Sequence, residues 1–562
     1  YNNFTATNLV ATDQMIDTPT NSFSVVNPLD NHYAASTFSE GNLKVVTSAG
    51  NYTYNTSTFA QSSGKWYCEI LDQSSGTNAR LGVAGTISTG TGNEFGDGSY
   101  HWAYISGTGE YENGGSHSSG YGDTYTSGDI IGIALDLENN KLYFSKNNTW
   151  QNSGDPTSGA TGTGAISITD PTGVTDGVYY VGMGDSSGSD SDTFVANFGA
   201  DSSFAGEKTA QGNGGDGEDF YYTPPTDYKA LNTDNLSAPD IKLPGDYFNT
   251  LLYTGTGATN ARTGLGFQPD MTWIKRRSSS PTSQHMLFDS IRLAPQYLVP
   301  NDVDADATDA NQLASFDSDG FTVGSGSSTN GTSATFVGWN WKAGGAPTAD
   351  NSAGVGAVPT AGSVKIDGSN LGSALAGSIA ATRLSANTET GFSIVSYTGD
   401  DASSATIAHG LSVAPDLVIV KSLDSLEGWY VGSSEGPMSF TSSDYLTLNT
   451  TGGESSASSI WDDTAPSASV FTVGTNNAVN NTDDFIAYCF HSVEGYSRVG
   501  GYTGNGNADG TFVYCGFRPA YLVIKRTDSA KNWFIHDDKR STYNVIDGET
   551  LKANTSGAEV SD

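Results

Sequence analysis

Apolar residues occur along this chain in short runs that alternate with polar residues, and stretches rich in Gly, Ser, Thr, Asn and Asp separate the runs. In one run Trp66, Cys68 and Ile70 alternate with Tyr67 and Glu69. A period of two is typical of a β-strand with one buried face. Runs with helical spacing are scarce, so the pattern predicts an all-β chain with long loops.

A second group of runs predicts a β-hairpin. Residues 130–137 carry an apolar residue at every second position, and residues 141–145 form the next run. Asn139 and Asn140 lie between the two runs, and asparagine tolerates the positive φ angles of a tight turn. The Lys-Asn-Asn sequence at 146–148 predicts a further turn.

Together these segments resemble the SPRY domain. The resemblance rests on a Gly-Lys-Trp-Tyr strand at 64–67 and on a Gly-Asp-x-Ile-Gly strand that leads into an Asp-Leu hairpin at 128–145. Further runs lie where that fold has strands, at residues 80–83, 180–183 and 195–199. The resemblance implies a β-sandwich over residues 35–220 that binds partners through its loops and performs no catalysis.

Beyond a linker at residues 221–246 the sequence repeats itself. A Tyr-Thr-Gly motif begins at Tyr253, Tyr397 and Tyr502. Each motif is followed by a proline and then by an apolar run that ends in Lys275, Lys421 or Lys525. The Tyr-to-Lys spacings are 275 − 253 = 22, 421 − 397 = 24 and 525 − 502 = 23. Three copies of so long an ordered pattern indicate related units.

Later landmarks set the expected boundaries of these units. Phe-Thr-Val-Gly begins at Phe321 and at Phe471, and an aromatic run follows at 336–341 and at 485–490. We expect a first β-sandwich at 247–345, a second at 391–496 and a truncated third at 497–562. The Gly-, Ala- and Ser-rich residues 346–390 predict a flexible or extended connector.

Tandem units that follow a SPRY-like domain resemble the repeat region of virion structural proteins of marine tailed bacteriophages. The Asn-Asn-Phe-Thr-Ala-Thr-Asn-Leu sequence at 2–9 and the segment 17–21 resemble a joint that follows a laminin-G-like lectin domain in such proteins. Residues 1–34 are therefore expected to be a joint from an upstream domain. The resemblance implies a tail-fibre or other particle-surface protein. Because the chain opens at Tyr1 without an initiator Met and stops inside a repeat unit, we expect it to be cut from a longer polypeptide at both ends.

The charge balance narrows the list of partners. The 562 residues include 25 Lys+Arg and 61 Asp+Glu, a formal charge of −36. Clustered bases, which phosphate contacts require, are absent from the sequence, so we expect neither nucleic-acid nor anionic-membrane binding. No apolar stretch approaches the ~20 residues of a membrane span. These features predict an external, modular protein.

The three cysteines, Cys68, Cys489 and Cys515, have no metal-ligand spacing and cannot form a disulfide framework. A Cys489–Cys515 pair is the alternative to buried free thiols, and we favour free thiols.

Three aromatic residues are the candidates for ligand binding. Trp102, Tyr104 and Tyr111 could form a flat apolar platform for a sugar. The alternative is a place in the core, because residues 100–105 have the pattern of a strand, and we favour it.

An acidic loop is the candidate for a Ca²⁺ site. Asp302, Asp304, Asp306 and Asp309 could supply carboxylate oxygens. The loop lacks the glycine and the terminal glutamate of an EF-hand, so we favour a solvated insertion and expect no bound cofactor.

Catalytic signatures are few. Gly-x-Ser-x-Gly occurs at 184–188 and 432–436, but neither match lies between a strand and a helix. The seven histidines form no spaced metal pair. The recurring lysines at 275, 421 and 525 are interpreted as solvated strand ends. The sequence therefore predicts a protein that is not an enzyme.

We expect a virion surface protein, most simply a tail fibre or adhesin that attaches to a host-cell glycan or protein through its SPRY-like loops. It would assemble with other virion proteins and form a homo-oligomer. A trimer is the expected form, because many fibres are trimeric. The alternatives are a fibre-borne polysaccharide depolymerase, a head-decoration or extracellular filament protein without a receptor, and a cellular adhesin.

Overall fold

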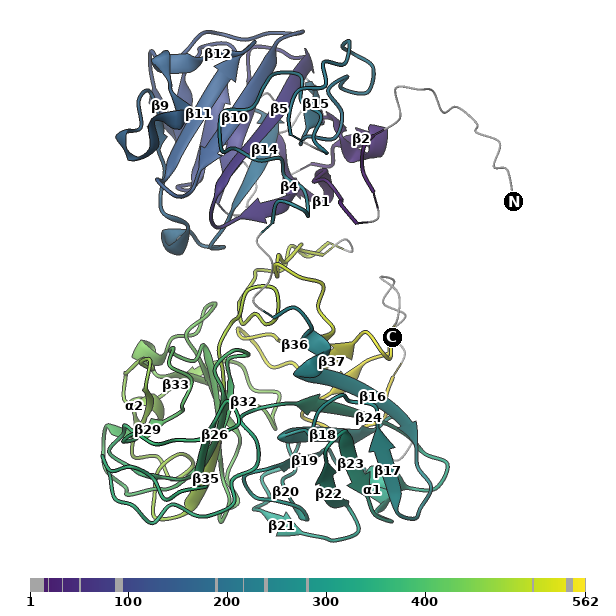
Figure 1. Cartoon of the computed structure of the whole chain (residues 1–562), viewed down its shortest axis with the longest axis vertical. Coiled ribbons are helices and arrows are strands. Elements are labelled where there is room, and N and C mark those ends of the chain that lie inside the picture. Colours follow the sequence, from purple (N-terminus) through teal and green to yellow (C-terminus); the bar gives the residue numbers. More distant parts are fainter. Residues whose placement is uncertain are drawn as a thin grey trace. The chain divides into compact units, whose positions relative to one another are not determined.

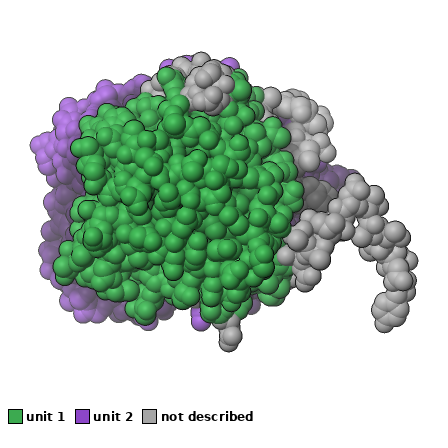
Figure 2. All heavy atoms as spheres, turned by 90° about the horizontal axis from the view of Figure 1, so that it is seen from above, with its two compact units in different colours: residues 1–237, 503–514 green, residues 238–502, 515–562 purple. Residues whose placement is uncertain are grey.

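The chain forms two compact units, which we describe separately (Figure 2). The computed structural model describes residues 15–560 except 19, 33, 50–51, 86–93, 187–190, 216, 237–240, 279–282, 508–509 and 542–548. Unit 1 comprises residues 1–237 and 503–514, and unit 2 comprises residues 238–502 and 515–562. Residues 1–14, part of the expected joint, lie outside the described residues.

Unit 1 is a β-sandwich of two sheets (Figure 1). In spatial order, the first sheet contains β1 (Val26–His32), β4 (Thr53–Gln61), β14 (Tyr179–Asp185), β6 (Ala79–Ala84), β7 (His101–Ile105), β8 (Tyr111–Asn113) and β9 (Ser116–Ser118). The second contains β12 (Thr149–Trp150), β11 (Lys141–Lys146), β10 (Ile130–Asp136), β5 (Lys65–Ser74), β15 (Thr193–Asn197), β3 (Lys44–Val46) and β2 (Thr37–Ser39), and β13 (Ile166–Ser167) pairs with β11.

The alternation in β5 identifies its inner face correctly. Trp66, Cys68 and Ile70 belong to the core between the sheets. The other face was expected to meet solvent, and that expectation is wrong because a later segment covers it. Tyr67 packs edge-on against Phe220, with ring centroids 5.1 Å apart.

Glu69 shows how the outer face is held. It is fully buried, and its carboxylate accepts hydrogen bonds from the backbone N–H groups of Tyr221 at 2.8 Å and Tyr222 at 2.7 Å. A buried carboxylate needs such donors, since water does not reach it. The start of the expected linker at 221–246 therefore packs against β5 and belongs to unit 1.

The predicted hairpin is confirmed. Asp136 at the end of β10 accepts hydrogen bonds at Oδ1 from the N–H groups of Glu138 and Asn139. Asn140 has a φ of 55°, the left-handed conformation that asparagine tolerates. This turn sets the register in which Asp136 faces Lys141.

The expected joint at 1–34 also needs correction within the described residues. Residues 26–32 form β1, which pairs with β4 in the first sheet. The sandwich therefore begins before residue 35. Pairing with β1 satisfies the backbone hydrogen-bonding groups along one edge of β4, which would otherwise be unpaired.

Unit 2 begins with a small sandwich. Its larger sheet has the order β16 (Phe248–Thr254), β24 (Thr335–Trp341), β18 (Met271–Arg276) and β19 (Met286–Asp289). Its smaller sheet has the order β17 (Asn260–Thr263), β23 (Gly320–Val323) and β22 (Leu313–Asp317), and helix α1 (Ser327–Asn330) follows β23. The short strands β20 (Gln296–Tyr297) and β21 (Ala307–Thr308) pair with each other.

A second sandwich follows. Its main sheet has the order β26 (Ser369–Asn370), β25 (Val364–Ile366), β27 (Ala381–Asn387), β28 (Phe392–Thr398), β35 (Asp484–Phe490), β30 (Leu417–Ser422), β31 (Tyr430–Ser433), β32 (Asp444–Thr447) and β33 (Ser455–Ser456). The pair β29 (Ala405–Ala408) and β34 (Val470–Val473) covers it, with helix α2 (Ser458–Trp461) before β34.

The expected connector at 346–390 is wrong in part. Strands β25 and β27 lie within it, and β27 pairs with β28 to extend the second sheet. Ala381, Leu384 and Ala386 have no exposed surface. Small apolar residues favour such close packing as well as flexibility, which is why composition alone misled.

The last part of unit 2 is a sheet of β36 (Tyr521–Lys525), β37 (Trp533–Asp537) and β38 (Leu551–Lys552). The Tyr-Thr-Gly motif at 502–504 is not in a strand, whereas Tyr253 lies in β16 and Tyr397 lies in β28. The expected third unit therefore starts its described sheet at β36.

One core joins the three parts of unit 2. It contains Trp273 and Trp339 from the first sandwich, Trp429 and Tyr488 from the second, and Trp533 from the last sheet. The two sandwiches also have separate cores of their own. The parts of unit 2 are thus packed together, because both faces of their main sheets are apolar.

Candidate functional site

The recurring lysines join one part of unit 2 to the next. Lys275 donates from Nζ to the carbonyl oxygens of Ser283 at 2.6 Å and Ser556 at 2.9 Å. Lys421 donates to Val303 at 3.3 Å, among other carbonyls, and Lys525 donates to Thr451 at 3.4 Å. The first part thus contacts the last, the second contacts the first, and the last contacts the second.

A second set of side chains repeats the same cyclic pattern. Trp429 donates from Nε1 to the carbonyl of Val299 at 3.2 Å, and Trp533 donates to that of Thr447 at 3.1 Å. His285 takes the corresponding place in the first part, with Nε2 3.1 Å from the carbonyl of Lys552. These rings and the lysines fasten the three parts around their shared core.

The tautomer of His285 follows from its partners. Trp273 donates from Nε1 to His285 Nδ1 at 2.9 Å, so the ring proton lies on Nε2 and is donated to Lys552. Complete burial holds the pKa of His285 well below its usual value. A neutral ring fits this place, because it needs one donor and one acceptor.

Lys275 and Lys421 are fully buried, so their interpretation as solvated strand ends is wrong. Burial lowers the pKa of each ammonium to about 8. A lowered lysine pKa is also typical of nucleophilic lysines. Here backbone carbonyls accept hydrogen bonds from both ammonium groups, so the geometry is that of a structural contact.

The acidic loop takes part in the same junction. Val303 accepts from Lys421, and the N–H of Asp306 donates to the carbonyl of Leu423 at 2.7 Å. Asp306 also pairs with Arg292 at 2.6 Å. Within the described ranges the oxygens of Asp302, Asp304 and Asp306 do not converge on one point. Asp304 is exposed, and Asp302 and Asp306 are half-buried, so the loop is partly solvated and also contacts the second sandwich.

The three aromatic candidates in unit 1 are placed mainly in its core. Trp102 is 4% exposed and packs edge-on against Tyr179, with centroids 5.7 Å apart. Tyr104 is fully buried and stacks on Phe144 at 5.2 Å. Tyr111 is half-buried. These positions agree with the core interpretation and leave Trp102 and Tyr104 no free face for a sugar.

Unit 1 contains a charged group on strands β6, β8 and β9 and on the loops that flank β7. We call it the Arg80 cluster: it consists of Arg80, Glu94, Asp97, Glu110, Glu112 and His117. Arg80 contacts Glu94 at 2.8 Å, forms an ion pair with the buried Glu112, and donates to the carbonyl of Phe95 at 3.1 Å. His117 Nδ1 lies 3.3 Å from Glu110.

The Arg80 cluster has more negative than positive groups. In the part of the chain that the structure describes, Glu94, Asp97 and Glu112 alone bring three carboxylates within 4.8 Å of one another. Arg80 already lies among them as a cation, so a metal ion is not required there. At the rim of the cluster His117 is exposed and Glu110 is half-buried, so the surface there is negatively charged.

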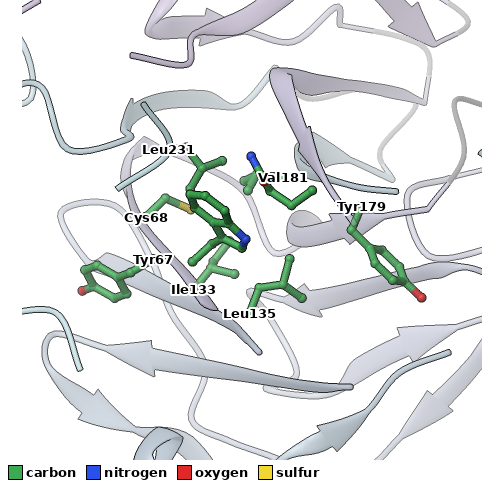
Figure 3. Close-up of a pocket in the computed structure, with 9 residues that line it drawn as sticks. Tyr67, Cys68, Ile133, Leu135, Tyr179, Val181 and Leu231 are labelled. Atoms are coloured by element: carbon green, nitrogen blue, oxygen red, sulfur yellow. The ribbon is translucent and has the colours of Figure 1, made fainter. Parts of the chain in front are cut away.

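The sandwich interior holds a cavity of only about 10 Å³, enough for one water molecule (Figure 3). Figure 3 shows it between side chains of β5, β10 and β14, including Cys68, Ile133 and Val181. Gln61 also lines it, and the Nε2 of Gln61 is buried without a protein partner. This cavity is too small for an organic ligand.

The structure also shows where the Gly-x-Ser-x-Gly matches and the cysteines lie. Ser434 of the second Gly-x-Ser-x-Gly match is exposed after β31, and no α-helix follows it directly. The first match includes residues that lie outside the described ones. None of the three cysteines forms a disulfide bond; Cys68 and Cys489 are buried and Cys515 is half-buried. No helix in the described part of the chain is long and apolar enough to cross a membrane.

Sequence reasoning missed the Arg80 cluster and the role of the lysines. A signal exists for both, because Arg80 and Lys275 are bases within apolar strand runs of a chain with only 25 Lys+Arg. A base in such a run predicts a buried partner.

The chain belongs to the family described as Domain of unknown function (DUF7483), whose model matches residues 243–367 and 366–562, more than half of the chain. Residues 65–166 match the SPRY domain. Unit 1 is thus a SPRY β-sandwich, and unit 2 is the DUF7483 region.

Two solved structures are similar to part of the chain. The SPRY domain of human HERC1 has 15% identity and a TM-score of 0.25, and the match covers 30% of this chain and 96% of that one. A human SPRY domain has 14% identity and a TM-score of 0.21, with 29% and 93% covered. No curated protein matches the chain.

Proposed function

We propose that this chain is a non-enzymatic surface protein of a tailed-bacteriophage particle, most simply a tail fibre or adhesin. The observation that carries the proposal is the SPRY domain at residues 65–166, a fold that serves as a binding module. The particle-surface assignment rests on the resemblance of the following units to phage virion proteins.

In this proposal the two units divide the work. Unit 1 binds a host-cell glycan or protein, and the exposed rim of the Arg80 cluster is its contact surface. Unit 2 is an assembly module, because its three parts share one core and are fastened by buried lysines. An assembly module of this kind needs no catalytic residues, because its task is to hold unit 1 on the particle. In this proposal the chain forms a homo-oligomer, and this oligomer assembles with other virion proteins. It acts outside the cell.

The binding part is tested by incubating the labelled full chain with host cells and measuring bound fluorescence. Glu110→Gln alters the exposed rim, and Glu138→Gln is the matched control, because Glu138 is 60% exposed and lies outside the cluster. We expect saturable binding that Glu110→Gln weakens several-fold and Glu138→Gln leaves unchanged. Equal binding by both variants would remove the Arg80 cluster from the proposal.

Three further measurements test the rest of the proposal. Immunogold labelling of purified particles should mark the tail, and absence of label would reject a virion protein. Host polysaccharide incubated with the chain should yield no new reducing ends, whereas their appearance would establish a depolymerase. Light scattering should give a mass above one chain, and a monomer at micromolar concentration would reject the oligomer.

A further inference from the structure

Residues 218–222 cover the outer face of β5 without belonging to a strand of either sheet. The ring of Phe220 has no exposed surface and packs against Tyr67. The carbonyl oxygen of Asp219 accepts a hydrogen bond from Asn197 Nδ2 at 2.9 Å. The segment is therefore attached to the second sheet through one aromatic ring and through its backbone.

The carboxyl group of Glu69 lies at the centre of this attachment. Its two oxygens accept the backbone N–H groups of Tyr221 and Tyr222, one on each oxygen. They also accept from Tyr67 Oη at 3.2 Å and from Asn197 Nδ2 at 3.3 Å. Two consecutive backbone donors of the covering segment thus depend on a single buried side chain of β5.

Neutral groups surround Glu69. The titratable groups that interact with its charge are Tyr67, Cys68 and Tyr222. Burial raises the pKa of all three above their usual values, so none of them is charged near pH 7. On the neighbouring strands Glu69 faces Asn197 of β15 and Gly132 of β10. Among the residues that the structure describes, no base forms an ion pair with Glu69.

Burial and hydrogen bonding act on Glu69 in opposite directions. The four donors favour the carboxylate, whereas the exclusion of water favours the carboxylic acid. Burial is the larger effect and raises the pKa of Glu69 from 4.5 to about 7. When residues 218–222 lift away, water reaches the carboxyl group and its pKa returns toward 4.5. Between these two values the closed state holds a proton that the open state has lost, so closure weakens as the pH rises.

We propose that residues 218–222 form a strap that opens from β5 as the pH rises and closes as it falls, with the carboxyl group of Glu69 as its latch. Opening removes Phe220 from Tyr67 and exposes an apolar cluster on the outer face of the second sheet. Arg80 belongs to the first sheet, so the opening of the strap is independent of whatever the Arg80 cluster binds.

Amide hydrogen exchange of the full chain at pH 5 and pH 8 tests the strap. The measured quantity is the protection factor, the ratio of intrinsic to observed exchange rate, so that the pH dependence of intrinsic exchange cancels. We expect the protection of residues 218–222 to fall about tenfold or more from pH 5 to pH 8. The paired amides of β5 and β10 should stay more protected at both pH values, because they exchange only when the sandwich unfolds.

Glu69→Gln replaces the titrating group by a neutral amide of similar shape. In this variant the protection of residues 218–222 should be the same at both pH values. Glu138→Gln is the matched control, since Glu138 is 60% exposed and lies in the turn after β10, and it should keep the pH dependence of the unaltered chain. Circular dichroism melting shows whether each variant folds. If Glu69→Gln does not fold, the comparison of residues 218–222 with β5 in the unaltered chain decides.

Three results would overturn the proposal: protection of residues 218–222 that stays constant or rises with pH, equal protection of residues 218–222 and β5 at both pH values, or a pH dependence that Glu69→Gln retains. The second result would show that the whole sandwich opens at once, and the third would show that a different group titrates.

Discussion

The ammonium group of Lys275 donates a hydrogen bond to the carbonyl oxygen of Ser556, 281 positions further along the chain, at 2.9 Å. Lys421 makes the corresponding contact to Val303, 118 positions earlier. Each of these long-range contacts joins one part of unit 2 to a different part, so together they hold the three parts against one another. The stability of unit 2 should depend on them.

Replacing Lys275 by Met should destabilise unit 2 by about 1–3 kcal/mol, because the carbonyls of Ser283 and Ser556 lose their buried donor. Lys525→Met is the matched control. Its ammonium is partly solvated, so the expected loss is below about 1 kcal/mol. Urea unfolding followed by tryptophan fluorescence gives both values. An equal loss in the two variants would contradict the role of burial.

The lysines also predict a pH dependence. Lys275 and Lys421 have pKa values of about 8 in the folded protein, below the value of 10.5 for an exposed lysine. Between pH 8 and 10 the unfolded chain therefore holds protons that the folded chain has released, so the free energy of unfolding rises with pH. Urea midpoints should increase from pH 7.5 to 9.5. The Lys275→Met/Lys421→Met double variant should lose this increase, and a retained increase would assign it to other groups.

Asp289 and Tyr488 form a buried hydrogen bond in which one partner is charged and the other is neutral. Replacing each in turn compares how much a buried charge and a buried hydroxyl contribute to the free energy of unfolding. Asp289 Oδ2 lies 2.6 Å from Arg292 and accepts from Tyr488 Oη at 2.8 Å. Asp289→Asn should cost about 2–4 kcal/mol, because it removes one of the two carboxylates, Asp289 and Asp306, that lie 2.6 Å from the buried guanidinium of Arg292. Tyr488→Phe should cost only about 1 kcal/mol, since it removes one neutral donor. Denaturant unfolding should show that order, and the reverse order would reject the explanation.

Unit 1 contains a carboxyl group with the opposite pH effect. Asp30 is buried, and this burial raises its pKa to about 7, although Thr56 donates a hydrogen bond to it. Between pH 4 and 7 the folded state holds a proton that the unfolded state has lost, so stability falls as the pH rises through this range.

Asp30→Asn should therefore stabilise the protein at pH 8, on the order of a few kcal/mol, and change it little at pH 4. Chemical unfolding at the two pH values provides the measurement. A variant that is less stable at pH 8 would show that Asp30 is needed in its charged form.

Divalent cations should leave the protein unchanged. Arg80 already supplies positive charge to Glu94 and Glu112, and the loop at 302–306 is engaged in unit 2. We expect millimolar CaCl₂ or EDTA to shift the melting temperature by less than about 1 °C. A larger shift that Glu94→Gln abolishes would place a cation in the Arg80 cluster after all.

Much of the local structure could be predicted from the sequence. The alternation of Trp66, Cys68 and Ile70 identified the inner face of β5, and Asn140 identified the hairpin turn. The positions of the apolar runs before Lys275 and Lys421 matched β18 and β30. These predictions succeeded because side-chain period and turn conformation are properties of neighbouring residues.

The fate of the second face of each strand could not be predicted in this way. Tyr67 and Glu69 of β5 are covered by residues 220–222, and Lys275 is covered by a segment near Ser556. The contact between the acidic loop and Lys421 could not be predicted for the same reason, since Lys421 is 118 positions from Val303. A pattern of alternation says that a face is apolar or polar but does not say what lies against it.

The sequence by itself determined the all-β character, the strands and the hairpin of this protein, because those depend on short-range backbone and side-chain preferences. Only the tertiary structure decided that Lys275 and Lys421 are buried fastenings, that Arg80 gathers carboxylates, and that three parts of unit 2 share one core. Those outcomes depend on which distant segments exclude water from a given side chain, and burial fixes both the partners and the charge that the side chain can keep.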